Sequence, residues 1–114
     1  MKYNGNLVIR SLLFTAGHND KYINKAFASD SDVIVFDLED AVPYNKKEEA
    51  RKKLKIILEE KINDKRPIFV RINPLETGQT LIDLDSVACE NLDGFVYPKA
   101  YNADDVKVFS AQLA

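Results

Sequence analysis

Three acidic residues, Asp37, Glu39 and Asp40, closely follow the apolar segment VIVF, where burial and mutual repulsion both disfavour negative charge. Two cationic residues stand at comparable places: Arg71 lies late in one apolar segment and Lys99 follows another. Carboxylates can hold a divalent cation directly or through waters, and the planar fork of an arginine binds an external carboxylate or acyl oxygen. These five residues are therefore candidates for a site that binds an anionic substrate.

The charged residues come late in each apolar segment. If these segments are parallel strands, their carboxyl ends lie at one edge of the sheet, where α/β proteins bind ligands. Side chains alternate along a strand, so Asp37 and Glu39 share a face, as do Arg71 and Asn73. A second interpretation is that these residues form only a partly buried ion-pair network that closes the end of the sheet and catalyses nothing.

Four apolar segments have the composition of buried strands, and each precedes a segment whose apolar residues have helical spacing. The predicted strands are residues 8–15, 33–39, 68–73 and 94–97. The first predicted helix begins at Asn19 or Asp20 and ends before the turn at 29–32, and the third ends near Asn91. The later three helices are predicted to begin at capping patterns: Asn45 with Glu48, Thr80 with Asp83, and Asn102 with Asp105.

This alternation predicts an α/β fold with a parallel sheet. Two architectures accommodate four βα units: an open doubly wound sheet, or a (βα)4 half of a TIM barrel. Periodicity does not choose between them. A chain of 114 residues is expected to form a single domain, residues 1–114.

Composition limits the classes of partner. With 46% hydrophobic residues, 30% charged residues and a net charge of -2, the chain has the composition of a soluble globular protein. No Gly-rich phosphate loop or net positive field supports nucleic-acid binding. No apolar run approaches the roughly 20 residues that span a bilayer, and we identify no signal peptide. The lone Cys89 cannot form an intrachain disulfide, which fits a cytoplasmic protein and a packing role.

Four further polar residues are weaker candidates for chemistry. His18 lies in the turn GHND, where a solvent-facing or capping role is expected. Tyr97 and Tyr101 flank Lys99 and can supply a hydroxyl, although packing beside a strand is the commoner role of tyrosine. Ser11 lacks the context of a nucleophile and is expected to pack.

Four motifs occur in register along nearly the whole chain: RSLLFTAG at 10–17, VIVFDLEDAV at 33–42, VRIN at 70–73 and VYPKA at 96–100. Together they resemble the citrate lyase beta subunit family, with malyl-CoA lyase and the citramalyl-CoA lyases, in the HpcH/HpaI aldolase superfamily. The resemblance implies a TIM barrel and Mg²⁺-dependent carbon-carbon cleavage or formation of a 3-hydroxyacyl thioester, carried by coenzyme A or an acyl carrier protein.

The resemblance also implies roles for individual residues. Arg71 would bind the carboxylate of the keto acid product, and Glu39 would lie near the metal and its waters. Arg10 and Phe14 would lie along the path of the thioester carrier, and Lys99 would border the site. Asp37, Glu39 and Asp40 are then candidates for contacts to the water shell of the metal rather than for direct ligation.

A full family member has about eight βα units and 250 or more residues, so the resemblance covers the N-terminal half of such a barrel. The family's direct metal ligands follow its fifth and sixth strands. We therefore expect a truncated lyase that is inactive alone and does not hold Mg²⁺ tightly. The alternative is a non-catalytic binding or assembly module that forms a homo-oligomer, or pairs with a complementary C-terminal half, through its open sheet edges. An open flavodoxin-like sheet that binds a small anion or nucleotide is a third interpretation.

Overall fold

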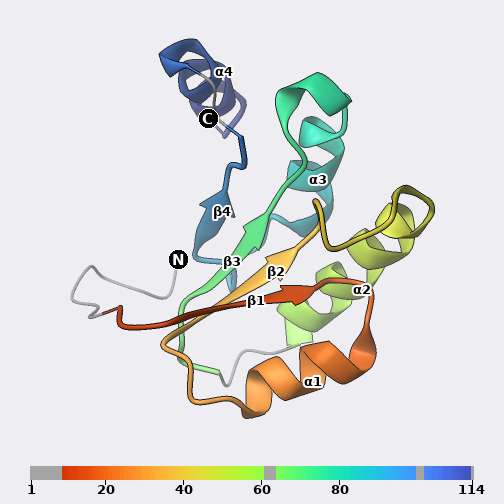
Figure 1. Cartoon of the computed structure of the whole chain (residues 1–114), viewed down its shortest axis with the longest axis vertical. Coiled ribbons are helices and arrows are strands. Elements are labelled where there is room, and N and C mark those ends of the chain that lie inside the picture. Colours follow the sequence, from red (N-terminus) through yellow and green to blue (C-terminus); the bar gives the residue numbers. More distant parts are fainter. Residues whose placement is uncertain (1–8, 61–63, 100–101, 114) are drawn as a thin grey trace.

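The computed structural model describes residues 9–60, 64–99 and 102–113. Four strands and four helices alternate along the chain, and the strands form one parallel sheet in the order β1-β2-β3-β4 (Figure 1). This confirms the predicted parallel (βα)4 fold. The elements are β1 (Leu12–Ala16), α1 (Asp20–Ala28), β2 (Val33–Asp37), α2 (Lys47–Glu60), β3 (Ile68–Arg71), α3 (Thr80–Val87), β4 (Gly94–Val96) and α4 (Ala103–Leu113).

All four helices contribute to one core, on one face of the sheet. Strand residues of β2 and β3 pack there against buried side chains from every helix: Ile34, Phe36, Ile68 and Val70 with Ile23, Ala26, Leu54, Leu58, Leu84, Val87 and Phe109. When crossovers share one hand, strands in sequential order place every connecting helix on the same face. A doubly wound sheet instead has helices on both faces. The arrangement is therefore compatible with one half of a (βα)8 barrel.

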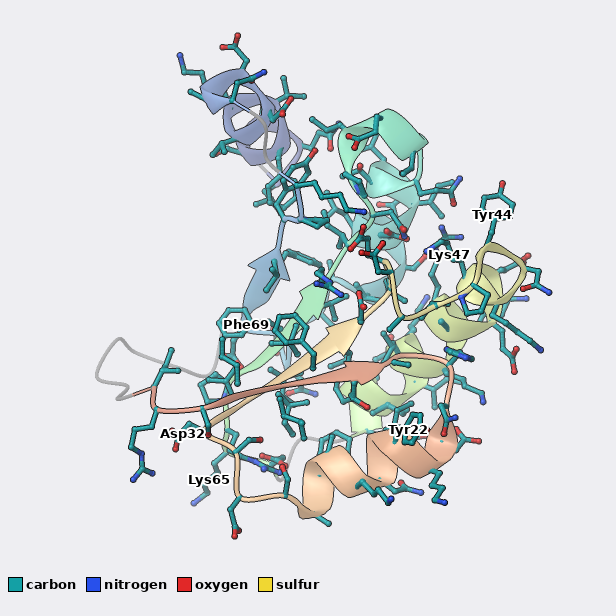
Figure 2. The ribbon with its side chains drawn as sticks, viewed as in Figure 1. Tyr22, Asp32, Tyr44, Lys47, Lys65 and Phe69 are labelled. Atoms are coloured by element: carbon teal, nitrogen blue, oxygen red, sulfur yellow. The ribbon has the colours of Figure 1, made fainter. Side chains whose placement is uncertain are left out.

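The opposite face of the sheet carries apolar side chains that no described helix covers. Leu12 and Phe14 of β1 are 53% and 45% exposed. The register places Phe14, Val35, Phe69 and Gly94 side by side across the sheet. A Cβ at Gly94 would lie 2.6 Å from the Phe69 ring, so this glycine makes room for the ring, which is labelled in Figure 2. We call this surface the open face.

Two strand boundaries differ from the prediction because side chains bind the backbone there. β1 begins at Leu12 rather than at residue 8, which lies outside the described residues; the amides of Arg10 and Ser11 donate to Asp32. β2 ends at Asp37 rather than at Glu39, because the Asp37 carboxylate accepts the amide of Glu39 and turns the chain.

The other two strands are also shorter than predicted. β3 ends at Arg71 and β4 ends at Val96, so neither reaches the predicted ends at residues 73 and 97. The amide of Asn73 leaves the ladder because it donates to the carboxylate of Asp83.

Two of the helix starts are confirmed. Asn19 caps α1 by accepting the amide of Tyr22, and Asn102 accepts the amide of Asp105 at the start of α4. No helix among the described residues has the length and apolar character needed to cross a bilayer.

The other two capping predictions are wrong. Asn45 lies inside a 3₁₀ turn, Tyr44–Lys46, that leads into α2. Thr80 is the first residue of α3, and its hydroxyl donates to the carbonyl of Asn73. α3 also ends at Val87 instead of near Asn91. Thr80 and Asp83 bind other elements instead of capping their own helix.

Candidate functional site

Arg71 lies at the carboxyl edge of the sheet between two acidic residues. Its Nε donates to Asp37 Oδ1 at 2.9 Å, and its Nη2 donates to Asp37 Oδ2 at 2.5 Å. Glu39 Oε1 lies 3.6 Å from the same Nε. Asp37 and Arg71 are register partners in β2 and β3, so the parallel sheet itself brings them together. This bidentate pair raises the pKa of Arg71 above its usual value.

Asp37 is a structural centre of this edge. It is 1% exposed, and its two oxygens accept the amides of Glu39 (2.8 Å) and Ala41 (3.0 Å) as well as the guanidinium of Arg71. Burial alone would raise the pKa of Asp37, but these hydrogen bonds outweigh burial and hold the pKa below its usual value. Both oxygens of Asp37 therefore have protein partners.

Glu39 and Lys99 form the second part of the site. Lys99 Nζ donates to Glu39 Oε2 at 2.5 Å and to Asp40 Oδ1 at 3.1 Å. Glu39 and then Asp40 raise the pKa of Lys99, and the hydrogen bond from Lys99 lowers the pKa of Asp40. Lys99 adopts the left-handed backbone conformation, with φ at 53°, which is uncommon for a residue with a side chain. The loop after β4 thus presents this ammonium to β2 in a strained conformation.

One polar atom of Glu39 and one of Arg71 lack hydrogen-bond partners among the described residues. One is Glu39 Oε1, which is buried although it carries charge. The other is Arg71 Nη1, because both hydrogen bonds of this guanidinium use Nε and Nη2. The Phe14 ring lies 4.9 Å from the guanidinium carbon and packs on its face. Asp37 thus holds the guanidinium through Nε and Nη2, and Phe14 packs on its face. The third donor group, Nη1, stays available.

A second buried hydrogen-bond network, centred on Asp83, lies near the site, and the sequence motifs did not predict it. Arg51 Nε donates to Asp83 Oδ1 at 2.7 Å, and Arg51 Nη2 also contacts Gln79. Asp83 Oδ2 accepts the side chain of Asn73 at 2.7 Å, and Asn73 donates to the carbonyl of Leu38 at 3.0 Å. Asn73 therefore serves this network and not the Arg71 site. The available signal was spacing: Arg51 precedes two core leucines of α2 by three and seven residues, so it lies on the buried stripe.

Lys47 fixes the loop that carries Glu39. This first residue of α2 donates from Nζ to the carbonyls of Leu38 and Glu39 at 2.8 and 2.9 Å. Burial lowers the pKa of Lys47 below its usual value. In the sequence this lysine lies in a run of charged residues, and nothing there distinguishes it from its neighbours.

Arg10 does not belong to this cluster. It precedes β1, and its guanidinium binds Asp32, which precedes β2; the Nη2 to Oδ1 distance is 3.0 Å. Figure 2 labels Asp32 at the end of the sheet opposite Lys47. Arg10 therefore lies at the amino end of the strands, away from the Arg71 cluster, and its expected place along the path of the thioester carrier stays a prediction.

The minor candidates bind elsewhere in the fold. The His18 carbonyl accepts from Lys53. The Tyr97 hydroxyl accepts the amide of Leu75, and its ring lies 4.9 Å from that of Phe109. The Ser11 hydroxyl accepts the amide of Asp32. Tyr101 lies outside the described residues.

The donor set does not fit a direct magnesium site. Within residues 9–60, 64–99 and 102–113, no group of three His, Cys, Asp or Glu side chains is arranged to hold a metal ion. Asp37 pairs with Arg71, while Glu39 and Asp40 pair with Lys99. The arrangement is instead suited to binding an anion beside a buried carboxylate.

Comparison with known proteins gives consistent matches. Residues 10–114 match the family described as HpcH/HpaI aldolase/citrate lyase. The chain is 37% identical over 97 residues to citrate lyase subunit beta of Haemophilus influenzae, covering 85% of this chain and 33% of that protein. It is 35% identical over 102 residues to (3S)-malyl-CoA thioesterase of Cereibacter sphaeroides, covering 90% of this chain and 36% of that protein.

A mammalian relative extends the comparison. The chain is 30% identical over 107 residues to the mitochondrial citramalyl-CoA lyase of Mus musculus, covering 92% of this chain and 32% of that protein. The alignments with these three relatives span about a third of their length.

Proposed function

Because the chain belongs to the HpcH/HpaI aldolase/citrate lyase family, we propose that Arg71 and Glu39 form part of a carbon-carbon lyase site. The substrate class is a carboxylated 3-hydroxyacyl thioester of the citryl-, citramalyl- or malyl-CoA type, carried by coenzyme A or an acyl carrier protein. One observation carries the proposal: the Arg71 guanidinium is held by Asp37 and Phe14 while its Nη1 has no hydrogen-bond partner among the described residues.

Each group has a distinct task in this proposal. Arg71 Nη1 donates to the carboxylate of the part of the substrate that leaves as a keto acid, and Lys99 adds a second positive charge nearby. Glu39 Oε1, which is buried without a hydrogen bond, accepts the hydrogen of the 3-hydroxyl group. Phe14 lies on the open face beside Arg71, where the thioester chain passes.

The proposal assigns binding groups to the described residues and no complete catalytic set. A Mg²⁺ ion in a lyase of this kind would stabilise the enolate that forms as the carbon-carbon bond breaks. The carboxylates at this edge are committed to Arg71 and Lys99 and do not supply three ligands. We therefore propose that the 114 residues bind the substrate carboxylate and do not turn it over by themselves.

Calorimetric titration tests this proposal. The chain is titrated with pyruvate, oxaloacetate, malate and a panel of acyl-CoA thioesters, with and without Mg²⁺. Loss of a charged hydrogen bond to a carboxylate predicts that Arg71→Ala weakens binding at least about tenfold. Arg10→Ala is the matched control because it removes an arginine at the opposite end of the sheet. If Arg71→Ala leaves the binding affinity unchanged, Arg71 is not part of the proposed site.

A second candidate function is assembly, and the open face favours it. β1 and β4 are the outer strands of the sheet, and exposed strand edges pair readily with other chains. Leu12 and Phe14 add exposed apolar surface between these edges. The partner is a second copy of the chain or a complementary C-terminal half.

Light scattering after size-exclusion chromatography tests assembly. An assembly module is expected to elute as a dimer, or to form a complex with the complementary half. Leu12→Glu should return it to a monomer, because the charge lies on the open face. Ile56→Glu, on the outer side of α2 and similarly exposed, should not. A parent chain that stays monomeric and binds no complementary half contradicts this function.

A further inference from the structure

Side chains hold the backbone around Glu39 on both sides of the residue. Lys47 Nζ donates to the carbonyls of Leu38 (2.8 Å) and Glu39 (2.9 Å). The Leu38 carbonyl also accepts from Asn73 at 3.0 Å, and the amide of Glu39 donates to Asp37 at 2.8 Å. Two successive peptide groups are thus fixed by side chains from α2, from the segment after β3 and from the end of β2.

Lys47 stands where a cation is disfavoured. It is the first residue of α2, and the helix dipole repels positive charge at a helix N-terminus. Its ammonium is also partly buried. A charge kept in such a place needs compensation, which the two carbonyls provide together with the charges of Asp83, Asp37 and Glu39. Figure 2 shows Lys47 beside the loop that follows β2.

We infer that Lys47 is a positioning residue, which fixes the Glu39 backbone so that the carboxylate points between Arg71 and Lys99. Among the described residues, the ammonium donates only to the carbonyl oxygens of Leu38 and Glu39 and makes no hydrogen bond to the carboxylate of Asp37 or Glu39. Its effect on the site therefore passes through the peptide groups of residues 38 and 39. The functional meaning of this role rests on the proposed function of Glu39, but the geometry can be tested without any ligand.

The test compares three variants of the full chain. Lys47→Met removes the ammonium and keeps the length of the side chain, while Lys47→Arg keeps donors that can reach both carbonyls. Lys52→Met removes an exposed lysine from the same helix and serves as the control. Amide hydrogen exchange measured by NMR reports the local opening of the loop, and competitive acetylation followed by mass spectrometry reports the access to Lys99.

The expected result is local. Lys47→Met should speed exchange of the Glu39 amide by about tenfold, the loss expected for hydrogen bonds from a charged donor. Acetylation of Lys99 should increase because the partner carboxylate is no longer fixed. Exchange at Phe36, in the centre of β2, should change much less. Lys47→Arg should restore both readouts, and Lys52→Met should leave both unchanged.

Two results would overturn the inference. One is unchanged Glu39 exchange and Lys99 acetylation in Lys47→Met. The other is an equal acceleration at Glu39 and Phe36, which would mean that Lys47 only stabilises the whole fold. If Lys47→Met does not fold, Lys47→Gln is subjected to the same two criteria. Because no substrate is present, failure of carboxylate binding at Arg71 would refute the proposed function and leave this result intact.

Discussion

Replacing Asp37 with asparagine removes the charge that holds Arg71 and leaves the shape of the side chain almost unchanged. Asp37 receives two hydrogen bonds from Arg71 and one each from the amides of Glu39 and Ala41. An asparagine presents one oxygen and one NH₂ group. Whichever way the asparagine amide is turned, some of the N–H groups of Arg71, Glu39 and Ala41 that now donate to a carboxylate oxygen would face its NH₂ group instead.

The size of the effect follows from burial. Removing one partner of a fully buried ion pair costs about 3–5 kcal/mol. Asp37 is 1% exposed, but the side chain of Arg71 is 26% exposed, so water compensates part of the loss. We expect Asp37→Asn to lower the free energy of unfolding by about 2–3 kcal/mol. For a domain of this size, the melting temperature should fall by about 10 °C.

Urea unfolding at several pH values is the assay. The pKa of Asp37 is lowered in the folded state, so its stabilising contribution is complete above the unfolded pKa of about 3.9. The contribution is lost as the pH falls through the lower folded-state pKa. The stability difference between parent and Asp37→Asn should thus be constant from about pH 7 to pH 5 and shrink below about pH 4.

Asp40→Asn is the matched control. This neighbouring carboxylate is exposed, and among the described residues its ion pair is with the exposed Lys99, so its replacement should leave the unfolding midpoint unchanged. Equal stability of Asp37→Asn and the parent at pH 7 would refute the reasoning. A stability difference that persists undiminished to pH 3 would show that the charge of Asp37 is not its source.

Three further predictions concern other parts of the fold. Asp83→Asn should lower the free energy of unfolding by about 3–5 kcal/mol in urea, because it leaves the buried Arg51 without its carboxylate partner; a loss below about 1 kcal/mol would contradict this. Gly17→Ala should destabilise by about 1–3 kcal/mol in thermal unfolding, since a Cβ would lie 3.0 Å from the carbonyl of residue 37 and 2.8 Å from a core leucine; an unchanged melting temperature would show that the turn can move. Asp32 should titrate by NMR with a pKa of about 2, lowered chiefly by its hydrogen bonds with Arg10. In Arg10→Ala the pKa should rise part of the way towards about 4, because the amides of residues 10 and 11 still donate to Asp32, and a pKa that stays near 2 would exclude the Arg10 side chain as the cause.

The sheet was predictable because its determinants are local. Apolar segments alternating with helical spacing specify parallel βα units, and the late charged residue of each strand must then lie at a shared edge. This rule correctly placed Asp37 and Arg71 together. Applied to Arg10, which precedes β1, the same rule gives the opposite edge. The resemblance grouped Arg10 with Phe14, whereas the strand separates them: Arg10 precedes β1, and Phe14 lies within it.

The site details depend on hydrogen bonds that composition does not encode. Thr80 and Asp83 have the spacing of a capping box, yet they bind Asn73 and Arg51. Polar groups of neighbouring elements, Arg51 of α2 and the carbonyl of Asn73, compete with the backbone of α3 for these two side chains. The spacing of residues along α3 contains no information about such neighbours. Compatibility with half of a barrel could likewise be judged only from the strand order, since the period of each segment is the same in both architectures.

The acidic residues after VIVF are explained by different partners, and the difference bears on whether this edge is a site or only a network. Asp37 and Asp40 have cationic partners and the expected contacts of structural carboxylates. Glu39 also has cationic partners, Lys99 and Arg71, but its buried Oε1 makes no hydrogen bond among the described residues, which costs about 1–3 kcal/mol. In the described part of the chain, the cationic contact of Oε1 is the 3.6 Å approach to Arg71 Nε, and an ion-pair network that served stability alone would gain by giving this oxygen a hydrogen bond. The cost is consistent with a ligand donor at that position, next to the available Nη1 of Arg71.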